Sequence, residues 1–268
     1  MPREQKCVLI TGAGSGIGRA LAIEAAQRGM VVALCGRRET ALEATGALLD
    51  EGSRHLIIPA DITNPQHRRR IVEIITDRWK ALDVLVNNAG VVEGGAVEKF
   101  DDAAINRTFL TNVIAPMALT RDLMPLLIAA RPSRVVNIGS VFGDIAYPLF
   151  SGYSASKFAL RGFSNALRRE WKQAGIGVTY AAPRATRTDA AVAFDDLIAH
   201  ANMSVDAPEQ VARQIWRSVA RGHDSIYAPA PERIYVLIQR MFPQIVDWAL
   251  SRQAPLHRIH LAEKDRST

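Results

Sequence analysis

Short runs of consecutive apolar residues alternate along the chain with longer segments whose apolar residues recur at helical spacing. The short runs predict strands, because a strand covered on both faces of a parallel sheet is apolar throughout. These runs lie at 7–11, 31–35, 55–60, 83–87, 135–140, 177–182 and 225–228, with predicted helices at about 19–28, 39–51, 65–80, 101–130, 153–172 and 208–222. The alternation predicts one α/β domain over 1–268, a doubly wound, mainly parallel sheet of Rossmann type with helices on both faces.

Two segments depart from this alternation. Residues 189–205 have mixed polarity and follow a predicted strand end, which favours a substrate lid. Residues 231–268 form a predicted C-terminal helical extension with apolar stretches at 234–243 and 245–250. Its apolar residues and flanking arginines suit peripheral contact with a membrane surface, whereas the alternative is packing against the core or a partner subunit.

Composition bounds the class of protein. The 268 residues are 48% hydrophobic, enough for a full core, and the net charge of +6 comes from basic residues spread along the chain. Aromatic residues are few, so nucleic-acid binding is not indicated, while an anionic cofactor or membrane surface suits the charge. The two cysteines, Cys7 and Cys35, fall in predicted strands, which indicates core positions, no metal site and a cytoplasmic setting. We expect neither a membrane-spanning run nor a signal peptide.

The residues between the first predicted strand and the first predicted helix include Gly12, Gly16 and Gly18. Glycines at this place let the backbone approach a pyrophosphate, whose charge meets the helix N-terminus. The alternative is a plain tight turn.

The end of the second strand decides the cofactor. An acidic residue there would bind the ribose 2′-hydroxyl of NAD, but the chain has Arg37 and Arg38, which suit a 2′-phosphate. NADP(H) is therefore favoured over NAD(H), unless both arginines only face solvent. Asp61 follows the third strand and either contacts the adenine or caps a turn. Asn87 follows as a predicted structural amide, and 88–90 as a predicted part of the cofactor cleft.

The candidate chemistry lies around the fifth strand. Ser140 follows that strand, and Tyr153 and Lys157 stand four residues apart on one helical face. A nearby ammonium lowers the pKa of a phenol, and a serine hydroxyl can bond the same substrate oxygen, so the three predict proton transfer to a carbonyl or from an alcohol. Asn112 is a poor helix former inside a predicted helix, which indicates a local kink or a bound water.

These motifs together resemble the short-chain dehydrogenase/reductase family, of the NADP(H)-preferring type, over 8–188. The resemblance rests on Thr11-Gly12-x-x-x-Gly16-x-Gly18, Asn87-Asn88-Ala89-Gly90, Asn112, Ser140 and Tyr153-x-x-x-Lys157. It implies a seven-stranded parallel sheet and a homodimer or homotetramer built partly from two long helices. The tail also resembles that of family members that act on lipophilic substrates.

The resemblance implies a role for each matching residue. Tyr153 would be the general acid/base, Lys157 would lower its pKa and hold the nicotinamide ribose, and Ser140 would orient the substrate oxygen. Asn112 would hold a water that relays protons. The implied and predicted cofactor residues are Gly12, Ser15, Gly16, Ile17, Gly18, Arg37, Arg38, Asp61, Ile62, Asn88, Ala89, Gly90, Tyr153, Lys157, Pro183, Thr186 and Thr188.

One position departs from the family's pattern. Arg184 follows Pro183 where the family usually has glycine, and glycine permits backbone shapes that arginine tolerates poorly. We therefore expect an altered nicotinamide cradle. Two hypotheses follow: an NADP(H)-dependent oxidoreductase for a carbonyl or secondary alcohol of a lipophilic substrate, or a weakly catalytic NADP(H)-binding sensor or scaffold.

Overall fold

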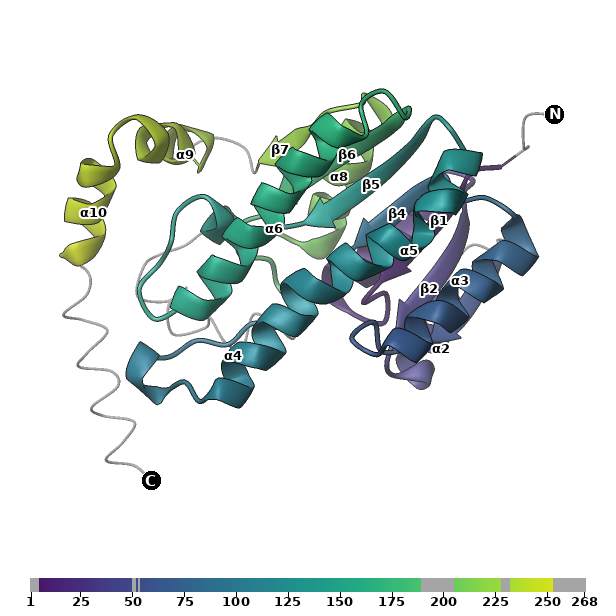
Figure 1. The fold of residues 1–268 in the computed structure, drawn as a ribbon, viewed down its shortest axis with the longest axis horizontal. Coiled ribbons are helices and arrows are strands. Elements are labelled where there is room, and N and C mark those ends of the chain that lie inside the picture. The colour runs from purple at the N-terminus through teal and green to yellow at the C-terminus, as the bar shows by residue number, and fades with distance from the viewer. Residues whose placement is uncertain (1–4, 50–51, 53, 189–204, 228–231, 253–268) are drawn as a thin grey trace.

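The computed structural model describes residues 5–49, 52, 54–188, 205–227 and 232–252 (Figure 1). Seven strands form one sheet in the order β3-β2-β1-β4-β5-β6-β7, and each neighbouring pair is parallel. The strands are β1 (Cys7–Thr11), β2 (Val31–Gly36), β3 (His55–Pro59), β4 (Val84–Asn87), β5 (Ser133–Ile138), β6 (Ile176–Ala182) and β7 (Ser225–Tyr227). The doubly wound, parallel fold class predicted from the apolar runs is confirmed.

Helices cover both faces of this sheet (Figure 1). Alternate residues of β1 show why: Val8 and Ile10 pack with one group of helices, whereas Leu9 packs with the other. The first group contains α1 (Gly16–Gln27), α2 (Glu39–Gly46) and α8 (Pro208–Ala220). The second contains α3 (Pro65–Trp79), α5 (Ala115–Ala129) and α6 (Ser151–Glu170). Cys7 and Cys35 are buried free thiols in the sheet, as predicted.

The strand order places a switch point beside β1. The chain proceeds from β1 to β2 and β3 on one side, then crosses to β4, β5, β6 and β7 on the other. Loops leaving β1 and β4 therefore diverge at the carboxyl end of the sheet, where parallel α/β sheets bind their ligands. This geometry fixes the location of the site.

Two predicted helices differ from the observed ones. The helix expected over 39–51 ends at Gly46, because Gly46 is a weak helix former and follows the β-branched Thr45. The helix expected over 101–130 is divided into α4 (Asp102–Phe109), a π-helical turn (Leu110–Ile114) and α5.

The last two helices of the described residues stand apart from the layers, at the left of Figure 1. They are α9 (Glu232–Met241) and α10 (Pro243–Ser251), and they expose several large apolar side chains. The predicted lid lies outside the described residues except for Val205. Among described helices, only Asp102–Ala129 is long and apolar enough to cross a membrane, and half of its apolar window is buried. That burial is typical of a helix packed on a sheet.

Candidate active site

A single cleft of about 1310 Å³ opens at the carboxyl end of the sheet. Its wall contains Ser140, Tyr153 and Lys157, together with every predicted cofactor residue except Gly18. Asn112 is buried behind the wall rather than in it. The fold therefore brings residues from across the chain to one site, as the sequence predicts.

The glycine turn approaches its surroundings too closely for larger residues. Gly16 has a φ of +52°, and a β-carbon there would lie 2.8 Å from Thr188 Cγ2. A β-carbon on Gly18 would lie only 2.1 Å from the Gly12 carbonyl oxygen. Gly18 therefore serves the close packing of α1 against the turn, while Gly12, Ser15, Gly16 and Ile17 face the cleft. Asn88 closes the turn from β4 by donating from Nδ2 to the Thr11 carbonyl at 2.9 Å.

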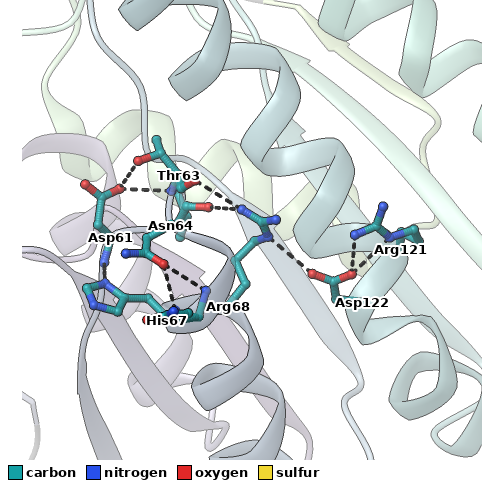
Figure 2. A network of polar contacts seen from close by, with 9 residues as sticks. Asp61, Thr63, Asn64, His67, Arg68, Arg121 and Asp122 are labelled. Carbon is teal, nitrogen blue, oxygen red and sulfur yellow. Dashed lines mark hydrogen bonds and ion pairs between the residues drawn. The ribbon is translucent and has the colours of Figure 1, made fainter.

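The side of the cleft after β3 is held by a polar network (Figure 2). Asp61 Oδ1 accepts from the Thr63 amide at 2.9 Å and from its hydroxyl at 2.7 Å, which is the turn-capping geometry predicted as one alternative. Arg68, buried on α3, donates to the Ile62 carbonyl at 2.9 Å and to Asp122 Oδ2 on α5 at 3.2 Å. This network ties the Asp61 loop to two helices, so Asp61 and Ile62 line the cleft in a fixed position.

Arg37 and Arg38 follow β2 directly and are exposed at the cleft wall, beside Asp61. Arg38 is also the N-cap residue of α2. Both arginines thus line the same cleft as Asp61, and their binding of a 2′-phosphate stays a prediction.

The candidate catalytic groups come from β5 and α6. Ser140 follows β5 and its Oγ accepts from the Phe142 amide at 3.2 Å, which starts a short 3₁₀ turn. Tyr153 lies in the first turn of α6, and one turn later Lys157 Nζ lies 5.5 Å from the Tyr153 ring centre. Lys157 Nζ also donates to the Ile138 carbonyl at 3.0 Å. All three groups thus face the cleft within one small region.

Burial sets the protonation of these groups. It raises the pKa of Tyr153 to about 12, although a hydrogen bond with Ser140 acts in the opposite direction. It also lowers the pKa of Lys157 to about 8. The sequence predicts a lowered pKa for Tyr153, so the direction differs, because burial penalises the phenolate more than its neighbours favour it. At neutral pH the Tyr153 phenol is protonated and can donate.

Asn112 lies in the π-helical turn between α4 and α5. Its side chain accepts from the Val91 amide at 2.8 Å and donates to the Val91 carbonyl at 2.9 Å and to Ser156 Oγ at 3.0 Å. Such turns interrupt helices at functional positions, and the predicted kink is confirmed. Both amide protons are used in these contacts, so the relay water stays a prediction. The contacts themselves bind the loop after β4 to α6.

We expect Asn112→Ala to lower the free energy of unfolding by about 3 kcal/mol, because it removes two hydrogen bonds to the half-buried backbone of Val91 and one to the buried Ser156 hydroxyl. Urea denaturation measures this change. The exposed Asn106 on α4 offers a matched control, and Asn106→Ala should change the stability by less than about 0.5 kcal/mol. Equal effects of the two substitutions would contradict the bracing role.

The backbone at Arg184 is unstrained. Among the described residues the non-glycine positions with positive φ are Lys80 and Leu149, so Arg184 has an ordinary backbone. Its guanidinium pairs with Asp206 and Glu232, and Pro183, Thr186 and Thr188 line the cleft around it. The chain does not adopt a positive-φ glycine conformation here, and the altered nicotinamide cradle stays a prediction.

Sequence reasoning missed several supporting residues. Tyr180 on β6 donates to the Ser140 carbonyl at 3.1 Å, and Ser156 bonds Asn112. Neither carries a local signal beyond being polar in a buried element.

Asn87, predicted as a structural amide, donates to Thr120 Oγ1 at 2.9 Å and to Asn137 Oδ1 at 2.8 Å. No group of three metal-ligating residues gathers anywhere in the described ranges.

Comparison with known proteins decides the family. A family model described as short chain dehydrogenase matches residues 6–196. The chain belongs to the short-chain dehydrogenase/reductase family. A relative from Anopheles gambiae, a dehydrogenase/reductase SDR family protein 7-like, is 32% identical and aligns with 93% of this chain and 83% of its own length. The chain is therefore an oxidoreductase of this family, as the motifs predict.

Solved structures of short-chain dehydrogenases agree in fold. One from Burkholderia phymatum in complex with NAD superposes with a TM-score of 0.83 at 23% identity, covering 91% of this chain and 96% of that one. Another from Sphingobium yanoikuyae in complex with NADPH has a TM-score of 0.77 at 27% identity, covering 94% of this chain and 95% of that one. Nicotinamide cofactors thus occur in the structural relatives, in both the NAD and the NADP form.

Proposed function

We propose that this short-chain dehydrogenase/reductase is an NADP(H)-dependent enzyme that reduces a carbonyl, or oxidises a secondary alcohol, on a lipophilic substrate. The observation that carries the proposal is the meeting of Ser140, Tyr153 and Lys157 in the cleft that also contains the glycine turn. Consumption of NADPH with aliphatic ketones tests it. Absence of turnover with any ketone or alcohol would favour the alternative, a weakly catalytic NADP(H)-binding sensor or scaffold.

The residues present fit a dinucleotide. The turn at Gly12, Gly16 and Gly18 has no room for a β-carbon, which is the geometry of a backbone cradle for pyrophosphate. Arg37 and Arg38 would bind the 2′-phosphate. Asp61 and Ile62 would contact the adenine. Asn88, Ala89, Gly90, Pro183, Thr186 and Thr188 would line the rest of the cofactor, as their place in the wall supports.

The protein's part in the reaction is to place and move a proton. NADPH, when bound, supplies the hydride. Ser140 orients the substrate oxygen, and the Tyr153 phenol donates its proton to that oxygen as the carbonyl is reduced. The Lys157 ammonium holds the nicotinamide ribose and favours the phenolate left behind, while a water near Asn112 returns the proton. In alcohol oxidation the same groups act in reverse.

The lipophilic substrate is supported by the apolar part of the cleft wall. Apolar side chains line it there: Val141, Phe142, Ile145, Ile238, Ile245, Val246 and Leu250. Such a wall favours an apolar substrate body and leaves the polar groups to orient the carbonyl.

The pKa values predict a pH profile for carbonyl reduction. Below about pH 8 both the Lys157 ammonium and the Tyr153 phenol are protonated; above it Lys157 loses its charge while Tyr153 stays protonated up to about 12. We therefore expect kcat/KM to be flat at lower pH and to fall about tenfold per unit above about pH 8. Initial rates over about pH 6 to pH 10 measure it. The residual activity of Lys157→Arg should lack this fall, because arginine stays charged; a flat wild-type profile would contradict the assignment.

Oligomerisation and localisation belong to the same proposal. Several large apolar side chains are exposed on the helices from α4 to α6, which supports the homodimer or homotetramer expected from the family. They are Ile105, Leu110, Ile114, Met117 and Phe158.

The tail also exposes large apolar side chains, which supports peripheral membrane contact of an otherwise cytoplasmic protein. They are Leu237, Met241, Phe242, Ile245 and Trp248. The division into one domain with a lid at 189–205 and an extension at 231–268 completes the proposal. Fractionation of full-length and tail-deleted protein separates membrane contact from packing against a partner.

A further inference from the structure

Arg184 joins three segments that are far apart in the sequence. Its Nε and Nη2 donate to the two oxygens of Asp206 at 2.9 and 2.6 Å, a bidentate pair, and Nη1 donates to Glu232 Oε1 at 2.9 Å. The side chains are 19%, 8% and 16% exposed, respectively, so the ion pairs are largely shielded from water. Shielded, bidentate contacts of this kind are strong and fix geometry.

The loop that carries Arg184 is itself held firmly. The backbone of Asp206 pairs with it on both sides, donating to the Ala185 carbonyl at 2.9 Å and accepting from the Arg187 amide at 2.9 Å. The Pro183 carbonyl accepts from the Val141 amide at 3.2 Å, which links the loop to the turn after Ser140. Arg184 therefore extends from a rigid part of the cleft that adjoins the candidate catalytic groups.

Glu232 begins α9, and residues at every fourth position of this helix contact the body. These residues are Glu232, Val236 and Arg240, and Val236 is the buried one. Arg240 donates to Asp144 Oδ1 at 2.9 Å at the other end of the helix. Since apolar burial under α9 is small, the two ion-pair sites decide where the helix lies. Helix α10, which contains no buried residue, packs on α9.

The position of α9 determines the shape of the cleft. Ile238 of α9 and Ile245, Val246 and Leu250 of α10 form its apolar wall, while Arg184 and Glu232 line the same cleft. We propose that Arg184 is a positioning residue that sets the substrate wall, by anchoring the first turn of α9 to the loop beside the catalytic groups. The inference rests on the proposed function, in that a carbonyl substrate occupies the space next to this wall.

Removing Arg184 would leave Asp206 and Glu232 facing each other without a cation. Glu232 Oε2 is buried and has no hydrogen-bond partner among the described residues, so its carboxylate depends on Arg184 for compensation. The glycine that the family usually has at this position would provide no such anchor. The first turn of α9 should then move away from the loop, and the wall should lose its fixed position.

Arg184→Met tests this inference, with Arg233→Met as the matched control, because Arg233 is an exposed arginine on α9 itself. Hydrogen–deuterium exchange of the 232–241 segment should be about tenfold faster in Arg184→Met and unchanged in Arg233→Met. With NADPH as cofactor, the KM for 2-decanone should rise about tenfold, whereas kcat and the KM for cyclohexanone should change less than about threefold. Glu232→Gln keeps the shape of the side chain and removes its charge. Its exchange rate in 232–241 and its KM for 2-decanone should lie between those of wild type and Arg184→Met.

The exchange measurement separates failure of this inference from failure of the proposed function. If wild type reduces neither ketone, the function is wrong, but exchange in 232–241 still decides the role of Arg184. Unchanged exchange in Arg184→Met would overturn the inference, as would equally faster exchange in the α5 and β4 segments, which would indicate a general loss of stability. An equal loss of activity with both ketones would also overturn it.

Discussion

Replacing Tyr153 by phenylalanine should lower kcat for NADPH-dependent carbonyl reduction by about 10³-fold. The substitution removes one hydroxyl, the proton donor in the cleft whose pKa burial raises to about 12 and which bonds the Ser140 side chain. The ring remains, packed edge-on against Phe142 with centroids 6.2 Å apart, so the fold should persist. Steady-state and single-turnover rates with one ketone measure the loss.

The control for this variant is the binding of NADPH. Its Kd should change less than about threefold in Tyr153→Phe, because the proposed pyrophosphate and 2′-phosphate contacts lie elsewhere in the cleft, and the free energy of unfolding should be nearly unchanged. A variant with intact NADPH binding and full turnover would exclude Tyr153 as the general acid. A variant that fails to bind NADPH would instead place the effect on the cofactor.

The sequence predicted those parts of the fold that local patterns determine. Each strand buried on both faces is a continuous apolar run. The strands Cys7–Thr11 and Val31–Gly36 can therefore be predicted without knowledge of the strands beside them. The sequence also indicated the candidate catalytic residues, because Tyr153 and Lys157 stand one helical turn apart and Ser140 directly follows a strand. Asn112 was recognised as unusual, and the π-helical turn explains it.

The parts that were missed depend on contacts across the chain. Arg184 was judged from the glycine that it replaces, but its effect comes from Asp206 and Glu232, which lie 22 and 48 residues away. The pKa of Tyr153 was assigned the wrong direction for the same reason. Its shift depends on burial, which neighbouring sequence positions do not reveal. Local sequence patterns thus predict the candidate chemical groups. The protonation state of Tyr153 and the proposed substrate wall depend on the structure.

Replacing Arg37 and Arg38 together by alanine should weaken NADPH binding by about 100-fold and change NADH binding by less than about threefold. Two charge-assisted bonds to a 2′-phosphate contribute about 3 kcal/mol together, and each 1.4 kcal/mol is a factor of ten. NADH lacks this phosphate, so the selectivity between the two cofactors should nearly disappear. Fluorescence titration of wild type and variant with each cofactor measures all four Kd values.

A second pair of arginines provides the control for the loss of positive charge. Arg69 and Arg70 are exposed on α3 and do not line the cleft, so their double replacement by alanine removes the same charge from another surface. NADPH binding should then weaken by less than about threefold, since exposed charges at a distance are screened by salt. Equal weakening by both double variants would reduce the role of Arg37 and Arg38 to general attraction of an anion. Equal binding of NADPH and NADH by wild type would contradict 2′-phosphate recognition, and the cofactor would then be NAD(H).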